Sequence, residues 1–408
     1  MPLLPVALAL LCVVGPLSTD MYLPVLPGLA GELGTDASGA QLTLTAFLAG
    51  MVLGHLVFGP LGDRFGRRRP LLAGAVGCAV ATGLCAVAPT LPWLIAFRFA
   101  AGFCGAAGVV LSRAVVADVL TGVRAARLAG LLVTLGGLAP VVAPPLGGAV
   151  AGVLGGRGVF WALAAVAVVV VVAVLIGVPE TLPPERRVTG GTAGFARSVR
   201  AVLRDRGYLG WTGAFGFGFA VLFCWIAGAP FLLRRILGPG VGGMSAVFAA
   251  GAAVTALAGL LSARLVGRVG PERLLRTGLR LLLGGSAALL AVAVAVPGER
   301  VTAALVLPPL GVICAGLGLV TPNAAALALA RVPYAAGTAS ALLGTFQSAA
   351  GALVAPLMGL GGGSALLPLA VGTTLCAAAA LLSARAAVSG GVPGRPVGEP
   401  EVSRRSSR

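Results

Sequence analysis

The sequence predicts an all-α polytopic membrane protein with twelve transmembrane helices, arranged as two pseudo-symmetric six-helix halves. Of its 408 residues, 58% are hydrophobic and only 10% are charged, whereas soluble domains are about 25% charged. Apolar runs of about 20 residues, the length that crosses a bilayer, recur from one end of the chain to the other. This composition excludes a soluble enzyme, a secreted disulfide scaffold and a disordered chain.

Twelve apolar runs, separated by Pro, Gly or Arg, give the expected spans. In chain order they cover residues 3–27, 40–60, 71–89, 92–114, 127–153, 158–178, 208–232, 242–263, 273–296, 300–330, 335–362 and 364–384. The longest loop divides six spans from six. The expected domains are a first six-helix bundle at 1–178, a cytoplasmic linker at 179–207, a second six-helix bundle at 208–386 and a disordered basic tail at 387–408.

Two short strings recur at equivalent positions in the two halves. The string LGDR at 61–64 follows the second span, and LSAR at 261–264 follows the eighth. The string APPLG at 143–147 lies in the fifth span, and APLMG at 355–359 lies in the eleventh. Such repeats are typical of transporters that arose by duplication of a six-helix unit.

The arginines predict the orientation in the membrane. All 29 basic residues are Arg, and the net charge is +17. Of these, 22 fall in loops and a tail on the side of the N-terminus, and four fall in loops on the other side. Because basic residues collect in cytoplasmic loops, we expect both termini in the cytoplasm, with the chain in a bacterial plasma membrane. The membrane therefore explains the basic balance, and no nucleic-acid partner is expected.

One carboxylate and one guanidinium lie deep in the expected spans. Asp20 precedes the outer end of the first span by seven residues, and Arg98 follows the outer start of the fourth by six, so both lie about 10 Å deep. Buried charges are costly and are therefore usually paired or functional. The matching depths predict an Asp20–Arg98 pair that couples transport to protons. The alternatives are an Asp20 that caps an irregular helix end near Pro24 and Pro27, and an Arg98 that reaches the interface.

The most specific string is GPLGDRFGRRRP at 59–70, between the second and third spans. It resembles the signature of the major facilitator superfamily, G-x-L-[AS]-D-R-x-G-R-[KR]. The resemblance implies a cytoplasmic gate in which the motif pairs with an acidic residue at the end of helix 4. The matching residues here are Gly59, Leu61, Asp63, Arg64, Gly66, Arg67, Arg68 and Asp118. An ordinary positive-inside loop would not need this order of residues.

The fifth span carries small or helix-bending residues at every fourth position, from Gly136 to Gly152. Such a stripe permits close packing of a neighbouring helix and a bend at the prolines. The segment is similar to the antiporter motif of exporters in the same superfamily, although Ala143 replaces a usual Gly. The residues that carry this similarity are Pro140, Pro144, Gly147 and Gly148. Close packing alone is the alternative explanation.

Further strings resemble the bicyclomycin/chloramphenicol-resistance (Bcr/CflA) drug antiporters over most of residues 3–386. They are DMYLP at 20–24, FW at 160–161, ETLPPERR at 180–187, TPNA at 321–324 and GTASAL at 337–342. Ala101 and His55 stand where that family has Gln. The resemblance implies a major facilitator fold and proton-coupled multidrug or antibiotic efflux by alternating access.

Scattered polar and aromatic residues within the spans are candidates for a substrate cavity. They are Tyr22, Phe47, His55, Asn323, Phe346 and Gln347. The aromatic residues could instead serve packing, and the two amides could satisfy backbone carbonyls at helix breaks. The expected partners are protons, small hydrophobic or amphipathic compounds and the lipid bilayer, and the chain is expected to act as a monomer.

No Walker A string, catalytic triad or metal-ligand cluster occurs in the sequence. We therefore expect neither an enzyme nor a cofactor nor a metal site, and the driving energy must come from an ion or solute gradient.

Two other functions remain open. One is import of a small metabolite by a symporter or facilitator of the same fold. The other is a membrane sensor or assembly partner without transport.

Overall fold

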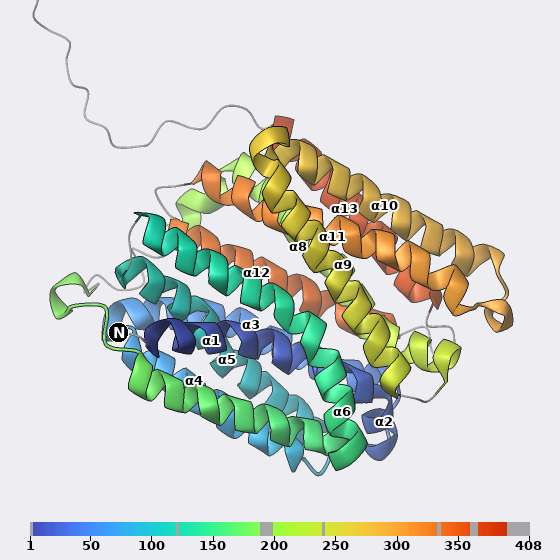
Figure 1. Ribbon diagram of the computed structural model, residues 1–408, viewed down its shortest axis with the longest axis horizontal. Helices are drawn as coiled ribbons and strands as arrows, with labels where there is room; N and C mark the ends of the chain where they lie inside the picture. The colour runs from blue at the N-terminus through green and yellow to red at the C-terminus, as the bar shows by residue number, and fades with distance from the viewer. Residues whose placement is uncertain are drawn as a thin grey trace, which may run out of the picture.

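The computed structural model describes residues 3–119, 122–187, 199–238, 241–332, 336–359 and 366–389. These residues form helices and connecting turns, and no strand occurs among them (Figure 1). Within this part of the chain, eleven helical segments are long and apolar enough to cross a membrane. The expected all-α membrane fold is confirmed.

The helices follow the expected spans closely. Those of the first half are α1 (Leu3–Asp20), α2 (Leu26–Glu32), α3 (Ala37–Phe65), α4 (Arg68–Ala86), α5 (Leu91–Val119) and α6 (Gly122–Gly177). Those of the second half are α8 (Arg206–Leu237), α9 (Val241–Val269), α10 (Pro271–Ala295), α11 (Ala303–Arg331), α12 (Ala336–Val354) and α13 (Leu366–Ser389). Short 3-10 turns are η1 (Leu23–Val25), η2 (Pro184–Arg186), η3 (Gly298–Arg300) and η5 (Ala355–Gly359).

Helix α6 contains two expected spans, 127–153 and 158–178. It is 56 residues long, and Gly155 interrupts it with a φ of +72°. A positive φ of this size is readily adopted only by glycine. The chain reverses direction at this point (Figure 1), so α6 supplies two crossings and brings the helical crossings to the twelve expected.

The first expected span, 3–27, is broken. Helix α1 ends at Asp20, and the chain continues through η1 into the short helix α2. Pro24 lies in η1 and Pro27 in the first turn of α2. Proline breaks a helix in its interior but is tolerated in the first turn, so both residues fit the break. Asp20 is therefore the last residue of α1, at the irregular helix end that the sequence offered as an alternative.

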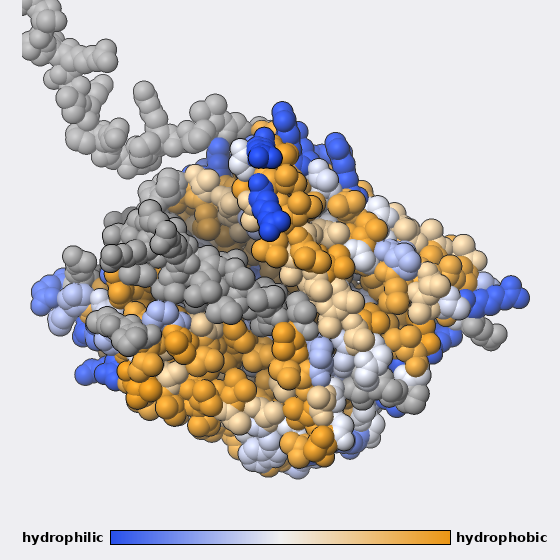
Figure 2. Space-filling view, viewed as in Figure 1, coloured by the Kyte–Doolittle hydropathy of each residue, from blue (hydrophilic) through white to orange (hydrophobic). Residues whose placement is uncertain are grey.

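The long helices that the structure describes run between two ends of the bundle (Figure 1). The linker end carries residues 66–67 and 178–187, and the far end carries residues 21–36, 87–90 and 296–302 (Figure 1). Between these ends, apolar side chains cover most of the visible face, and hydrophilic residues gather near its margins (Figure 2). Large apolar side chains such as Leu257, Val294 and Leu375 are 65% or more exposed. An exposed apolar belt of this extent fits a lipid environment.

Glycines bring α3 and α5 into backbone contact. A Cβ atom on Gly102 of α5 would collide with the carbonyl oxygen of Phe47, and one on Gly50 of α3 would collide with the carbonyl oxygen of Phe99. Small residues at such crossings allow helices to approach closely, and dispersion contacts then hold them together in lipid. The α3–α5 crossing therefore depends on these glycines.

The variant Gly102→Ala should lower the stability of the folded protein by about 1–3 kcal/mol, because the added methyl forces the two backbones apart. Thermal unfolding of the purified protein in lipid nanodiscs measures this. The matched control is Gly284→Ala on α10, where a Cβ would meet nothing within 4 Å. Equal melting temperatures for the two variants would contradict the close α3–α5 approach.

Candidate functional site

A buried guanidinium lies at the centre of the first half. Arg98 on α5 is 1% exposed. Its Cζ lies 4.4 Å from the ring centroids of both Tyr22 and Phe47, and 6.0 Å from that of Phe160. Its Nη1 donates a hydrogen bond of 3.0 Å to the carbonyl oxygen of Ser18. Cation–π contacts away from water each stabilise a cation by about 2 kcal/mol. Three aromatic rings and one carbonyl therefore hold the charge of Arg98.

The nearby carboxylate has less support, since Thr19 is the side chain that bonds to it. Asp20 is 6% exposed, and its Oδ1 accepts no hydrogen bond. The ion pair that the sequence predicts is not formed in this conformation, because Arg98 bonds instead to Ser18, two residues earlier on α1. A charged carboxylate without a cation beside it is costly when buried, whereas the protonated acid costs much less. The surroundings of Asp20 thus favour its neutral form.

The Pro- and Gly-rich part of α6 packs beside Asp20. Pro144 and Gly147 are buried, and Gly148 is half-buried. A Cβ on Gly147 would collide with the carbonyl oxygen of Met21, the residue that follows Asp20. The side chain of Pro140 lies outside the described residues. The antiporter-like segment is therefore in direct contact with the chain at Asp20.

A second cluster of charges lies at the linker end, between α3 and α4. Arg67 donates from Nη1 to Asp63 at 2.6 Å and from Nε to Asp118 at 3.0 Å. Thr181 donates to the same carboxylate of Asp118 at 3.2 Å. Desolvation lowers the pKa of Arg67, but its bonds to Asp118 and Asp63 raise that pKa more, so the guanidinium stays charged. The structure thus brings together the three charged residues that the family resemblance indicated.

Other residues of the same motif have different contacts. Arg64 lies over the ring of Phe65, at 5.2 Å from its centroid. Arg68 donates to the carbonyl oxygen of Leu175 at 2.8 Å. Gly59 faces α5, and Leu61 packs against the buried residues of that region. These residues therefore pack the turn against α5 and bond it to α6, whereas Arg67 makes the ion pairs.

Sequence reasoning missed Glu180 as a member of this cluster. Its carboxylate accepts hydrogen bonds from the backbone N–H groups of Arg67 at 2.8 Å, Leu182 at 3.1 Å and Arg68 at 3.4 Å. Gly66 has a φ of +89° and leaves room for the carboxylate, with which a Cβ would collide. Burial raises the pKa of Glu180, but these N–H groups and Arg187 lower it by more than burial raises it. The pKa of Glu180 therefore lies below its ordinary value. The string at 180–187 was singled out only for its family resemblance, and the acid at its start was the available signal.

The remaining cavity candidates are not gathered around Arg98. Asn323 is buried and donates to Ser262 and to the carbonyl oxygen of Leu319, both at 2.7 Å. His55 is buried against Gly344, where a Cβ would lie 3.3 Å from the imidazole. Phe346, 40% exposed, and Gln347, half-buried, lie further along α12. Only Tyr22 and Phe47 of the six candidates contact Arg98.

The variant Glu180→Gln should lose about 1 kcal/mol of stability at pH 7, because charge-assisted bonds to backbone N–H groups are weakened. Since the pKa of Glu180 is lower in the folded state, the stabilisation is complete above the unfolded value. It is lost as the pH falls through the folded value, so the gap should begin to narrow near the ordinary glutamate pKa of about 4.3 and shrink further as the pH falls. Thermal unfolding across pH measures this, with the exposed Glu185→Gln as control. A gap of constant size from pH 7 to pH 3 would contradict the assignment.

Comparisons with known proteins agree with this architecture. The sequence model of the Major Facilitator Superfamily matches residues 8–356. The uncharacterized MFS-type transporter YdgK of Bacillus subtilis is 33% identical over 359 residues, which cover 86% of this chain and 87% of YdgK. A bicyclomycin resistance protein homolog of Haemophilus influenzae is 30% identical over 354 residues, which cover 86% and 87% of the two chains. The multidrug resistance protein MdtL of Escherichia fergusonii is 27% identical over 385 residues, 94% of each chain.

Solved structures share the fold at low sequence identity. A bacterial homolog of the human lysosomal transporter Spinster, inward-facing and unoccupied, has a TM-score of 0.73 at 16% identity and covers 95% of this chain and 96% of its own. A D-xylose–proton symporter has a TM-score of 0.71 at 14% identity and covers 92% and 96%. The relatives confirm the resemblance to drug-resistance transporters that the sequence motifs indicated. From its matched sequence model, its helices and its relatives, this chain belongs to the major facilitator superfamily of membrane transporters.

Proposed function

We propose that this protein is a proton-coupled exporter of small hydrophobic or amphipathic compounds, antibiotics among them, in a bacterial plasma membrane. The linker end faces the cytoplasm, and the protein works as a monomer. The bundles at 1–178 and 208–386 rock against each other about a site near the midplane. The names of the bicyclomycin resistance and multidrug resistance relatives support this substrate class.

The observation that carries the proposal is the separation of Asp20 from Arg98. Arg98 is stabilised by Tyr22, Phe47 and Phe160 and by the carbonyl of Ser18. These contacts offset part of the cost of the buried charge without a carboxylate, while Nε and Nη2 of Arg98 make no hydrogen bond among the described residues. In this conformation Asp20 can therefore be neutral. When Asp20 loses its proton, the new carboxylate lies two residues from the present acceptor of Arg98. The negative charge attracts the guanidinium away from the aromatic rings. The two protonation states of Asp20 therefore favour two positions of α1 against α5.

A proton at Asp20 can influence the wider structure through α6. Gly147 contacts the backbone of Met21, so a shift at the end of α1 displaces the Pro- and Gly-rich part of α6. At the linker end, the cluster of Asp63, Arg67, Asp118 and Glu180 ties α3, α4, α5 and the linker together. We assign this cluster to the cytoplasmic gate. Protons that enter from outside bind Asp20, and substrate leaves outward.

The variant Asp20→Asn should abolish resistance in an efflux-deficient bacterium, because an amide cannot exchange a proton. The measurement is growth inhibition by a panel of antibiotics and dyes at equal expression. Asp36→Asn is the matched control, since Asp36 only caps α3 by accepting from the N–H of Gly39 at 2.8 Å and Asn caps helices equally well. Equal protection by wild type and Asp20→Asn would make Asp20 structural. No protection by wild type against any compound would favour uptake of a metabolite.

The double variant Asp20→Asn with Arg98→Gln should show strong coupling between the two sites. Once Asp20 cannot ionise, the loss of Arg98 should cost much less further transport, with a coupling free energy of about 1–3 kcal/mol. Exchange of labelled substrate for unlabelled substrate across vesicle membranes needs no proton transfer, so it provides rates for wild type, both single variants and the double variant. Strictly additive effects would show that the two residues act independently.

A further inference from the structure

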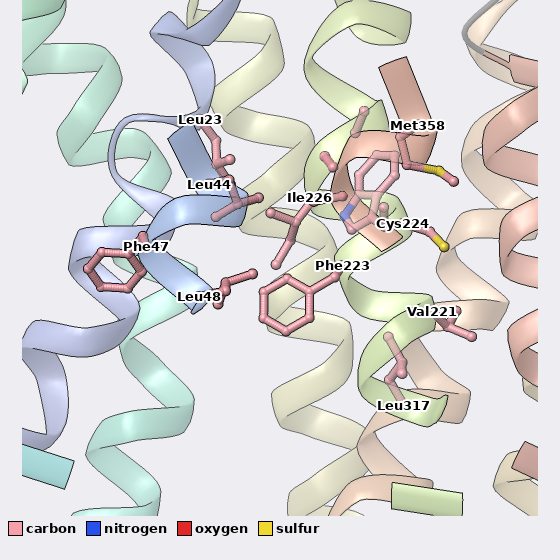
Figure 3. Close-up of a cluster of buried hydrophobic side chains, with 14 of the residues drawn as sticks. Leu23, Leu44, Phe47, Leu48, Val221, Phe223, Cys224, Ile226, Leu317 and Met358 are labelled. Carbon is pink, nitrogen blue, oxygen red and sulfur yellow. The ribbon is translucent and has the colours of Figure 1, made fainter. Parts of the chain in front are cut away.

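The two halves meet along two seams, α6 against α9 and α3 against α12, η5 and α8, and the second of these reaches the far end. This far-end seam consists of Gln41, Leu44 and Leu48 on α3, Phe223, Ile226 and Ala227 on α8, and Gly351 on α12. Leu44 and Leu48 point toward Ile226 and Phe223 (Figure 3). Positions 41, 44 and 48 lie on one face of a helix. The middle of the seam is therefore apolar.

Glycines of α12 receive the side chains of α3. A Cβ on Gly351 would lie 2.7 Å from Leu48 Cδ1 and 2.6 Å from Phe223 Cδ2, so both side chains rest on bare backbone. Seven residues away on both helices, the imidazole of His55 rests on Gly344 in the same manner. Contacts of this kind are dispersive, and in a membrane they separate without a large penalty for exposed polar groups.

Gln41 makes a polar contact across the seam. Its Nε2 donates a hydrogen bond of 2.9 Å to the carbonyl oxygen of Ala227, and both residues are fully buried. Among the hydrogen bonds and ion pairs between described residues, this one joins residues 3–187 to residues 199–389, whereas the others stay within one of these segments. The Oε1 atom of Gln41 has no hydrogen-bond partner among them. The amide is thus held at the seam by one bond across it.

We propose that Gln41 is the latch of the far end and that its bond to Ala227 holds the substrate exit closed in this conformation. The assignment of an exit rests on the proposed export function. Opening the far end moves α3 away from α8, breaks this bond and lets water reach both the amide and the carbonyl. Gln41 is therefore a positioning residue, which sets how often the far end opens and does not itself bind substrate or proton.

The variant Gln41→Met tests the latch, because it keeps the length of the side chain and removes the donor. Hydrogen–deuterium exchange of the full chain in lipid nanodiscs, without substrate, measures opening at each end. One net hydrogen bond corresponds to a factor of about 2–10 in an equilibrium, so peptides of residues 21–41 and 226–238 should exchange about 2–10 times faster. Peptides of residues 61–69 and 178–187 at the linker end should exchange at the wild-type rate or more slowly.

The matched control is Leu42→Met, one residue along α3, where the side chain is 41% exposed and outside the seam. This variant should exchange like wild type at both ends. The variant Gln41→Asn is the second probe, because it keeps a polar amide that is one methylene too short to reach Ala227. It should accelerate the far end as Gln41→Met does, even where the methionine variant accumulates poorly.

Two results would overturn the proposal. Wild-type exchange at the far end in both Gln41 variants would show that the bond does not restrain opening. Faster exchange at both ends would show a general loss of stability, as expected of an ordinary structural hydrogen bond. The readout needs neither substrate nor proton gradient. Faster far-end exchange in the Gln41 variants, together with no drug resistance from the wild type, would therefore support the latch and contradict the proposed export function.

Discussion

The first half of the molecule is organised around the burial of one positive charge. A guanidinium in an apolar interior is unfavourable unless polar or aromatic groups replace its water. Arg98 obtains those groups from Tyr22 beside η1, Phe47 of α3 and Phe160 of α6, and from the carbonyl of Ser18 in α1. Four segments must therefore meet α5 at one point. The close crossing of α3 and α5 and the break after α1 both serve this meeting.

The number and length of the helices could be predicted because apolar length alone decides whether a segment crosses a bilayer. The depth of Asp20 and Arg98 could be counted in the same way. Equal depth led to the prediction of an ion pair that this conformation does not form, because depth is one coordinate and the direction of a side chain depends on how neighbouring helices pack. The aromatic rings that hold Arg98 come from segments up to 76 residues away in the sequence, and no spacing rule reveals them.

Polar residues in apolar spans were ambiguous for a related reason. A buried amide needs hydrogen-bond partners, and either a substrate or the protein itself can supply them. Asn323 finds its partners in Ser262 and Leu319, so it joins α11 to α9. Glu180 was missed because its partners are backbone N–H groups, which leave no pattern of side chains. Asp63, Arg67 and Asp118 were found because the order of residues in the turn is itself informative.

The reversal of α6 at Gly155 has a mechanical consequence. A flexible loop between two crossings would absorb movement, but a single residue leaves almost no slack. Gly147 lies eight residues before this reversal and Phe160 five residues after it. The first touches the chain at Asp20, and the second faces Arg98. The two arms of α6 therefore form a stiff unit that contacts the chain at Asp20 with one arm and Arg98 with the other, and a displacement of one arm is transmitted to the other.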